Sequence, residues 1–142
     1  MSKSILLEII TPSKLFYKGE IELVICRTLS GDEGFMADHA WACKLLDVGE
    51  LWIKESGSKD FKIAAISKGY VDIKDYIVIY TDAAEWSQDI DKKKALSEKE
   101  RAEHWLALPH TKEEGNDVML AKIALQKSIT RMNVSEGGAR RK

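Results

Sequence analysis

Short hydrophobic or alternating segments, separated by turn residues, occupy the first 82 residues of the chain. In residues 20–27 the alternation places Ile21, Leu23 and Ile25 on one face, and in residues 69–74 it turns Val71 and Ile73 inward. A period of two is the pattern of a strand with one buried face. Strands are predicted at residues 5–10, 20–27, 49–55, 61–67, 69–74 and 76–81, and this spacing indicates an antiparallel sandwich or barrel.

The pattern becomes helical after the last predicted strand. Asp89 or Asp91 can cap a first helix, and Pro109 ends it because proline has no amide proton to donate. A second helix is expected over residues 118–132, with its cap at residues 116–117. The two predict a helical hairpin whose contact face carries Ala95, Ala102, Trp105 and Leu106 on the first helix and Ala121, Ala124 and Leu125 on the second.

These elements predict an α+β chain in two parts. An antiparallel β-sandwich covers residues 1–86, a helix-turn-helix hairpin covers residues 87–136, and residues 137–142 form a disordered basic tail. Two short helices alone are marginally stable in water. The hairpin is therefore expected to need a covering surface, on the β-sandwich or on another molecule, and to be the part that moves.

The net charge of −1 conceals an asymmetry between the two parts. Residues 1–86 carry ten basic and fourteen acidic side chains, whereas residues 87–142 carry twelve basic and nine acidic ones. The end of the chain is attracted to acidic surfaces by this bias, although a solvated basic terminus is the plainer interpretation. From residue 118 onward the basic side chains are Lys122, Lys127, Arg131, Arg140, Arg141 and Lys142, against one acidic residue.

Cysteine usage and the N-terminal segment predict an intracellular setting. Cys26 and Cys43 have neither C-x-x-C spacing nor a nearby histidine pair, so we expect two buried free thiols and no metal site. No signal peptide precedes the first strand, and no apolar stretch approaches the roughly 20 residues that span a bilayer. The chain is expected to be cytosolic, or docked to something at the membrane.

No residue pattern in the sequence is typical of catalysis. The three histidines, His39, His104 and His110, form no pair at helical spacing and adjoin no nucleophile motif. A G-x-S-x-G elbow, a phosphate-binding P-loop and an H-E-x-x-H helix are all missing. The four tryptophans form no stacking ladder with basic residues, which speaks against a nucleic-acid partner. A non-catalytic protein is predicted.

An ordered set of short motifs resembles one known family. The motifs are Thr11-Pro12, Tyr17-Lys18-Gly19-Glu20, Thr28-x-x-Gly31-x-x-Gly34, His39-Ala40, Ala64-x-x-Ser67-x-Gly69-Tyr70-Val71, Thr81-Asp82-x-Ala84-Glu85 and Ile90-Asp91-x-x-Lys94-Ala95. In this order, and followed by a helical hairpin, they are similar to the epsilon subunit of F-type rotary ATP synthases over almost the whole chain. The departures are Trp41 for a usual proline, Lys68 for a glycine and Lys94 for an arginine.

The resemblance implies a rotor subunit without catalytic activity. Its β-sandwich would bind the gamma subunit and the ring of c subunits in the central stalk, which couples ion translocation to ATP synthesis. Its hairpin would extend along gamma to the catalytic alpha and beta subunits and inhibit ATP hydrolysis. The expected location is the cytoplasmic face of a bacterial plasma membrane, peripheral and not inserted.

Two sets of residues follow from this comparison for the protein partners. The segment 30–45 is expected to form an exposed loop on the rotor, because aromatic and methionine side chains are favoured in interface cores. Its contact residues would be Asp32, Glu33, Phe35, Met36, His39 and Trp41. The hairpin would inhibit hydrolysis through Lys122, Lys127 and Arg131.

A regulatory ATP site in the folded hairpin is also implied by the resemblance, and no cofactor is required. Several cations would converge on the triphosphate, and Glu85 would accept a hydrogen bond from adenine or ribose. Lys94 and Lys127 replace arginines of the family pattern and lack their bidentate fork. A solvated helix face with ordinary pairing is the alternative. The candidate residues are Glu85, Ile90, Asp91, Lys94, Arg101, Lys127 and Arg131.

Two competing functions remain open at this stage. The first is a β-sandwich binding module whose basic helical tail contacts an unrelated acidic partner, such as nucleic acid or lipid. A strongly salt-dependent affinity for nucleic acid would support it. The second is a small enzyme, which the missing nucleophile–base set makes the weakest of the three.

Overall fold

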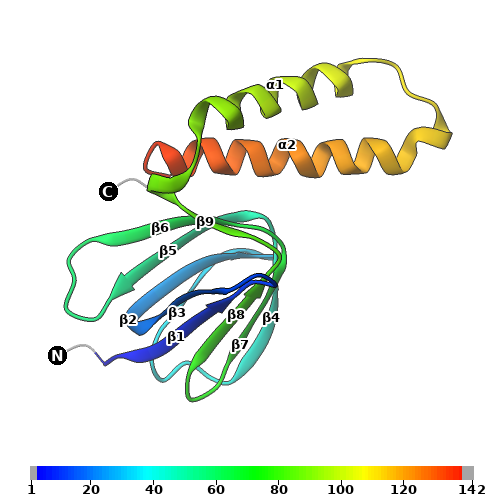
Figure 1. Cartoon of the computed structure of the whole chain (residues 1–142). Coiled ribbons are helices and arrows are strands. Elements are labelled where there is room, and N and C mark those ends of the chain that lie inside the picture. Colours follow the sequence, from blue (N-terminus) through cyan, green and yellow to red (C-terminus); the bar gives the residue numbers. More distant parts are fainter. Residues whose placement is uncertain (1–2, 139–142) are drawn as a thin grey trace. The chain divides into compact units, whose positions relative to one another are not determined.

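The computed structural model describes residues 3–138 and shows strands followed by two helices (Figure 1). The chain divides into two compact units, one ending at Trp86 and one beginning at Ser87, which we call the β unit and the hairpin. The strands are β1 (Ile5–Ile10), β2 (Leu15–Thr28), β3 (Gly31–Phe35), β4 (Ala42–Leu46), β5 (Gly49–Glu55), β6 (Phe61–Ile66), β7 (Gly69–Ile73), β8 (Ile77–Thr81) and β9 (Ala84–Trp86). The helices are α1 (Lys92–Ala107) and α2 (Gly115–Ser135), each preceded by a short 3-10 turn, Ser87–Asp89 and Lys112–Glu114.

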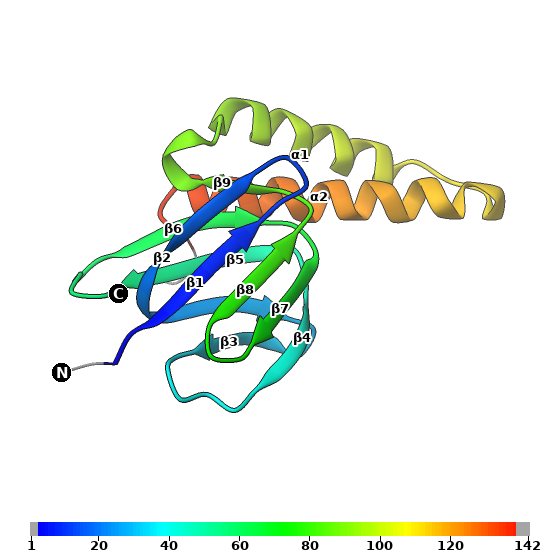
Figure 2. The same ribbon diagram turned by 60° about the horizontal axis from the view of Figure 1, so that its bottom comes forward.

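The strands of the β unit surround a common interior (Figures 1 and 2). Their order is β1-β8-β7-β4-β2-β5-β6-β9, with β3 paired to β2 and β1 paired to β2 as well as β8. The β1–β8 pair is parallel, and the other strand pairs of the described residues are antiparallel. The predicted β-sandwich followed by a helical hairpin is confirmed.

Strand β2 differs from the prediction in length and in its buried face. It spans fourteen residues, and between Ile21 and Leu23 its pairing with β5 slips by one residue. Such a bulge shifts the alternation, so that the side chains after it exchange faces. Ile21 is buried as expected, but Val24 and Cys26 then point into the core in place of Leu23 and Ile25.

The segment predicted as one loop, residues 30–45, contains two strands. β3 forms a hairpin with β2 through the pairs Val24–Phe35 to Thr28–Gly31. β4 pairs with β7 from Ala42–Ile73 to Leu46–Gly69. The exposed loop is therefore limited to residues 36–41, between the two strands.

The core of the β unit consists of large aliphatic side chains and one phenylalanine, contributed by many strands. The fully buried ones include Leu7, Ile9, Ile21, Leu51, Ile53, Ile73, Ile77, Ile79, Val24, Val48, Val71 and Phe35. Burying each such side chain contributes roughly 1.5–3 kcal/mol. The last strand of the unit is fixed by Trp86, whose ring stacks on Phe16 at 4.5 Å between centroids and meets Tyr17 edge-on at 5.8 Å.

In the hairpin, α1 and α2 lie side by side (Figure 1). Asp91 caps α1 by accepting a 3.0 Å hydrogen bond from the amide of Lys94, and α1 ends at Ala107, before Pro109, as predicted. The cap predicted for the second helix is wrong. α2 begins at Gly115, after a turn in which the Glu114 carboxylate accepts the Thr111 amide proton at 3.0 Å.

Side-chain burial in the hairpin also departs from the prediction at one position. Ala95 and Ala102 are buried, whereas Ala124, expected on the contact face, is exposed. α2 is followed by a turn at Gly137 and Gly138, both with positive φ, and the Gly138 amide bonds to the Asn133 carbonyl at 2.6 Å. This is the usual way to end a helix with glycine. The rest of the predicted disordered tail, residues 139–142, lies outside the described residues.

Candidate interaction surfaces

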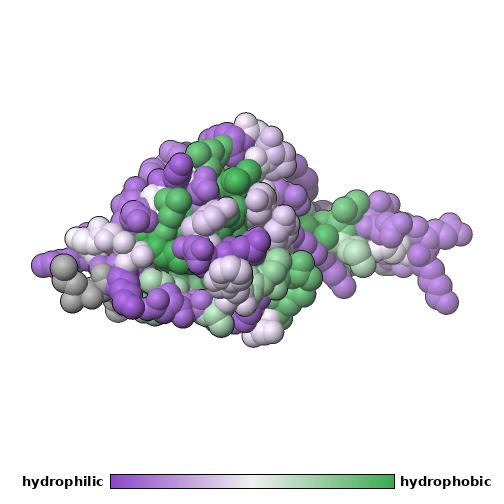
Figure 3. Space-filling view, turned by 90° about the horizontal axis from the view of Figure 1, so that it is seen from below, coloured by the Kyte–Doolittle hydropathy of each residue, from purple (hydrophilic) through white to green (hydrophobic). Residues whose placement is uncertain are grey.

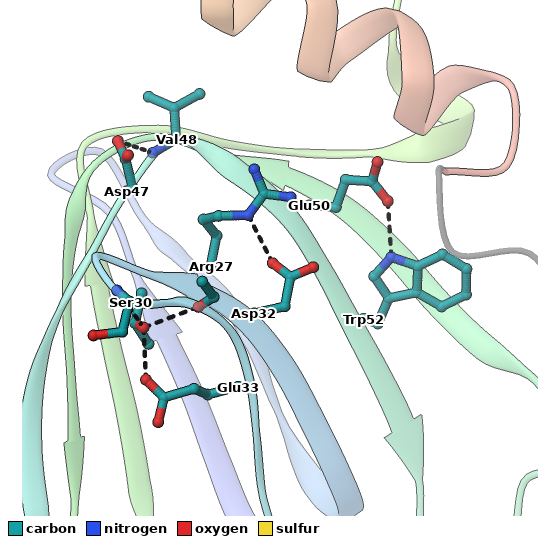
Figure 4. A network of polar contacts seen from close by, with 10 residues as sticks. Arg27, Ser30, Asp32, Glu33, Asp47, Val48, Glu50 and Trp52 are labelled. Atoms are coloured by element: carbon teal, nitrogen blue, oxygen red, sulfur yellow. Dashed lines mark hydrogen bonds and ion pairs between the residues drawn. The ribbon is translucent and has the colours of Figure 1, made fainter.

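A polar network occupies the turns β2–β3 and β4–β5 of the β unit (Figure 4). The Arg27 Nε donates to Asp32 at 2.7 Å, and this bond raises the pKa of the guanidinium, with further contributions from Asp47 and Glu50. In the same network the Trp52 indole donates to Glu50 at 3.0 Å. Three carboxylates around one arginine leave this corner acidic, and the hydrogen bonds fix the positions of the carboxylates.

Glu33 follows Asp32 on β3, and its carboxylate is held by two hydrogen-bond donors. The Lys44 ammonium is 2.6 Å from one carboxylate oxygen, and the Thr28 hydroxyl donates to the other at 2.6 Å. These bonds lower the pKa of Glu33, the lysine contact being the larger cause. The nearby Cys26 thiol is buried, and burial raises its pKa to about 12, with smaller contributions from Glu33 and Asp32. Such a thiol stays protonated and unreactive.

The predicted rotor-contact residues do not form one cluster. Phe35, expected to be exposed, is 0% exposed and belongs to the core, because it closes the buried face of β3. Met36 and Trp41 are exposed at 56% and 67%. Asp32 sits near the β2–β3 turn, at the opposite end of β3 from Met36.

The loop 36–41 keeps its shape through several local contacts. His39 donates its amide to the Met36 carbonyl at 3.3 Å and sets its ring edge-on against Phe35 at 5.1 Å. Asp38 has a φ of 69° and accepts from the Lys3 ammonium at 2.7 Å. Beside the loop is an open pocket of about 520 Å³, lined by residues of β1, the loop and the β7–β8 turn, among them His39 and Trp41. Figure 3 shows this end of the β unit, with hydrophobic patches between hydrophilic side chains.

A row of apolar side chains crosses five neighbouring strands on the outer face of the β unit. Leu45 pairs with Tyr70, Tyr70 with Tyr80, Tyr80 with Ile10, and Ile10 with Leu15. We call these five residues the apolar row. Strands lie about 4.8 Å apart, so the row is roughly 19 Å long. Figure 2 shows β1, β8 and β7, which carry its centre, side by side.

The members of the apolar row are accessible to a partner. All except Ile10 are exposed large hydrophobic side chains, and the rings of Tyr70 and Tyr80 stack at 4.8 Å. An apolar pocket of about 370 Å³ adjoins them, next to Pro12 and Gly69. Contiguous exposed apolar surface of this kind marks interaction sites. The sequence pattern predicts Leu45 only as the end of a loop and does not predict the row, although Tyr70 stands on the outward side of an alternating strand.

The second cysteine also lies on this outer face. Cys43 occupies β4 between Trp41 and Leu45, and it is exposed. The expectation of two buried thiols is therefore correct for Cys26 and wrong for Cys43. The reason is the alternation of β4, which turns Leu46 inward and Cys43 and Leu45 outward.

The basic side chains proposed for ATP and for inhibition are distributed over both helices. Lys94 and Arg101 on α1, and Lys122 and Lys127 on α2, are exposed. Arg131 is partly buried, and its guanidinium lies 3.3 Å from the carboxylate of Glu98 on α1. Glu85 belongs to β9 of the β unit, whereas Ile90 is buried and Asp91 serves as the cap of α1.

Over residues 3–138, no group of three or more histidine, cysteine or acidic side chains is placed to hold a metal ion. None of the helices in the described part of the chain is long and apolar enough to cross a membrane.

Family models match both units of the chain. The beta-sandwich domain of the ATP synthase delta/epsilon chain matches residues 4–87, and the long alpha-helix domain of the same chain matches residues 88–136. This chain belongs to the ATP synthase delta/epsilon family. As an epsilon chain it is a non-catalytic subunit of the central stalk, and the resemblance stated from the motifs is confirmed.

Bacterial epsilon chains and a solved structure extend this result. The Bacillus velezensis ATP synthase epsilon chain is 33% identical over 94% of this chain and 98% of its own length. The Alkaliphilus oremlandii epsilon chain is 42% identical over 75% of this chain and 79% of its own. A chain in the Euglena gracilis mitochondrial ATP synthase structure with OSCP, F1 and c-ring has a TM-score of 0.78 at 22% identity, covering 89% of this chain and 78% of its own, and so shares the fold.

Proposed function

We propose that the β unit of this epsilon chain binds the gamma subunit and the c-ring, and that the hairpin inhibits ATP hydrolysis at the alpha and beta subunits. The observation that carries the first part is the apolar row, because large side chains in register across five strands leave an apolar strip exposed. Tyrosine and leucine in such a strip can be buried by a partner without leaving a charge unpaired.

The c-ring contact is assigned to the acidic and loop residues of the same unit. Asp32 and Glu33 present their carboxylates on β3, paired with Arg27 and Lys44, and Met36, His39 and Trp41 belong to the loop after its other end. Phe35 is removed from this set because it is fully buried. If the β unit contacts both the gamma subunit and the c-ring, the subunit would lie peripherally at the cytoplasmic face of the bacterial plasma membrane.

The inhibitory role rests on the composition of the hairpin surface. Lys122 and Lys127 are exposed along α2, where they can meet acidic groups of a catalytic subunit. Met119 and Leu120 are exposed on the same helix, so an extended hairpin would bury apolar surface as well as charge. ATP is proposed as a regulatory ligand of the folded hairpin, held by Lys94, Arg101, Lys127 and Arg131 together with Glu85, Ile90 and Asp91.

The gamma and c-ring contact is tested by recovering the complex from native membranes. A Leu45→Ser, Tyr70→Ser double variant should remain folded, because both side chains are exposed, and should be retained at least about fivefold less than the parent chain. The matched control is Leu29→Ser, a leucine in the β2–β3 turn that lies outside the row and is at least as exposed as Leu45 and Tyr70. Equal retention of the double variant and the parent would contradict the proposed contact.

A further inference from the structure

An ion pair joins the first half of α1 to the last turns of α2. Glu98 on α1 and Arg131 on α2 are 33 residues apart in the sequence, and their carboxylate oxygen and guanidinium nitrogen are 3.3 Å apart. The side chain of Arg131 is 18% exposed and that of Glu98 37%. The pair is thus partly removed from water. A charge–charge contact in such a partly buried place is screened less than one on an open surface.

The position of Glu98 follows from the helical repeat. Ala95 and Ala102, the buried residues of α1, lie three positions before and four positions after it. Residues at these spacings share one stripe of a helix, and the contact with Arg131 shows that this stripe faces α2. Arg131 in turn lies three residues from Ser128 and three from Val134, both buried. The ion pair is therefore set among the buried residues of the two helices, on the faces along which α1 and α2 pack.

The charge of Arg131 has a second proposed ligand besides Glu98. It is one of the four cations assigned above to the triphosphate, and phosphate oxygens bind the same guanidinium nitrogens that a carboxylate does. A guanidinium satisfied by Glu98 must release that carboxylate, at least in part, before a phosphate can take its place. Leaving the Glu98 carboxylate half-buried and next to an incoming polyanion is unfavourable.

We propose that Glu98 is an internal anion that holds Arg131 in the folded hairpin and competes with ATP phosphate for it. When no ligand is bound, the carboxylate holds the two helices together through Arg131. When ATP binds, the same carboxylate lowers the ATP affinity of the site. The second half of this inference rests on the proposed ATP site. A second interhelix contact, Lys92 with Glu136 at 3.2 Å, joins the start of α1 to the residue that follows α2.

Glu98→Gln tests the competition in the full chain. Calorimetry with ATP should give at least about fivefold tighter binding than the parent, the lower end of measured couplings between sites. The matched control is Glu103→Gln, which removes the same charge from the same helix but from an exposed pair with Lys99 within α1. Circular dichroism would check that both variants keep their helices. Equal affinities for the Glu98 and Glu103 variants would overturn the inference.

A double-mutant cycle tests the closure without ATP. Amide hydrogen exchange measures the opening of the hairpin in the parent, in Glu98→Gln, in Arg131→Gln and in the double variant. We expect the double variant to lose no more protection than either single variant, and added salt to weaken the parent more than the double variant. Additive losses would overturn the inference. If no variant binds ATP, the proposed nucleotide site fails, and this cycle alone decides the role of Glu98.

Discussion

The β unit and the hairpin bury different kinds of side chain. In the β unit the fully buried residues are large, including Phe35, Leu7 and Leu51, and they come from strands throughout the sequence of the unit. In the hairpin the buried residues of the two helices are Ala95, Ala102, Ser128, Thr130 and Val134. Several of its large apolar side chains, among them Met119 and Leu120, are exposed.

This difference separates a scaffold from an element that can be rearranged. Buried leucine, isoleucine and phenylalanine each contribute roughly 1.5–3 kcal/mol, so the β unit is held by its own core. A pair of helices joined by small side chains and a few ion pairs gains much less from closing. The hairpin can therefore exchange its folded arrangement for contacts with a partner at small cost, whereas the β unit cannot.

The largest expected effect is the loss of an aromatic side chain from the core. Phe35→Ala should destabilise the β unit by about 3–5 kcal/mol, the usual result of removing a buried phenylalanine ring. A double replacement of its exposed neighbours, Met36→Ala and Trp41→Ala, should change stability by no more than about 0.5 kcal/mol. Urea unfolding measures both. Similar losses in the two variants would show that Phe35 is not a core residue.

The burial of Phe35 also illustrates where sequence patterns stop being informative. The glycines at residues 31 and 34 suggested a loop, but only the pairing of β3 with β2 decides which of its side chains point inward. The bulge after Ile21 likewise reversed the buried face of β2, and no local pattern announces it. The turn from sheet to helix, the cap at Asp91 and the end before Pro109 were predictable because capping and proline act locally.

The apolar row shows the same limit at the level of the site. Its members come from residues 10, 15, 45, 70 and 80, and only the register of five strands, including a parallel pair, brings them together. The motifs that revealed the family lie around these residues and do not describe a surface. The Glu98–Arg131 pair was also missed, since two residues 33 positions apart meet only when the hairpin closes.

A smaller effect is expected from the cap of α1. Asp91→Ala removes the acceptor of the Lys94 amide and should cost about 1 kcal/mol of helix stability. Asp89→Ala is the control, because Asp89 ends the preceding 3-10 turn and does not cap α1. Amide exchange in α1 should increase for the first variant only, with the β unit unchanged. Faster exchange in both variants, or in neither, would contradict the assignment of the cap.

The smallest effect is expected on the stability of the β unit as the pH is lowered. The Lys44 and Thr28 contacts lower the pKa of Glu33 below its ordinary value of 4.5, so this carboxylate stabilises the β unit above that pH and the contribution disappears as the pH falls through the lowered pKa. Glu33→Gln should leave a shallower loss of stability on acidification than the parent. Thermal melting between neutral and acidic pH measures the slope. Parallel curves for the two chains would mean that Glu33 makes no such contribution.

The central claim is that the β unit attaches the subunit and the hairpin regulates the enzyme. The most direct measurement compares complexes assembled with the full chain and with a chain ending at Gln88, recording the amount bound and the rate of ATP hydrolysis. We expect the shortened chain to be retained as well as the full one and to raise hydrolysis, because the basic, apolar surface of α2 is then missing. Equal hydrolysis with both chains at low and high salt, or failure of the shortened chain to bind, would contradict the account.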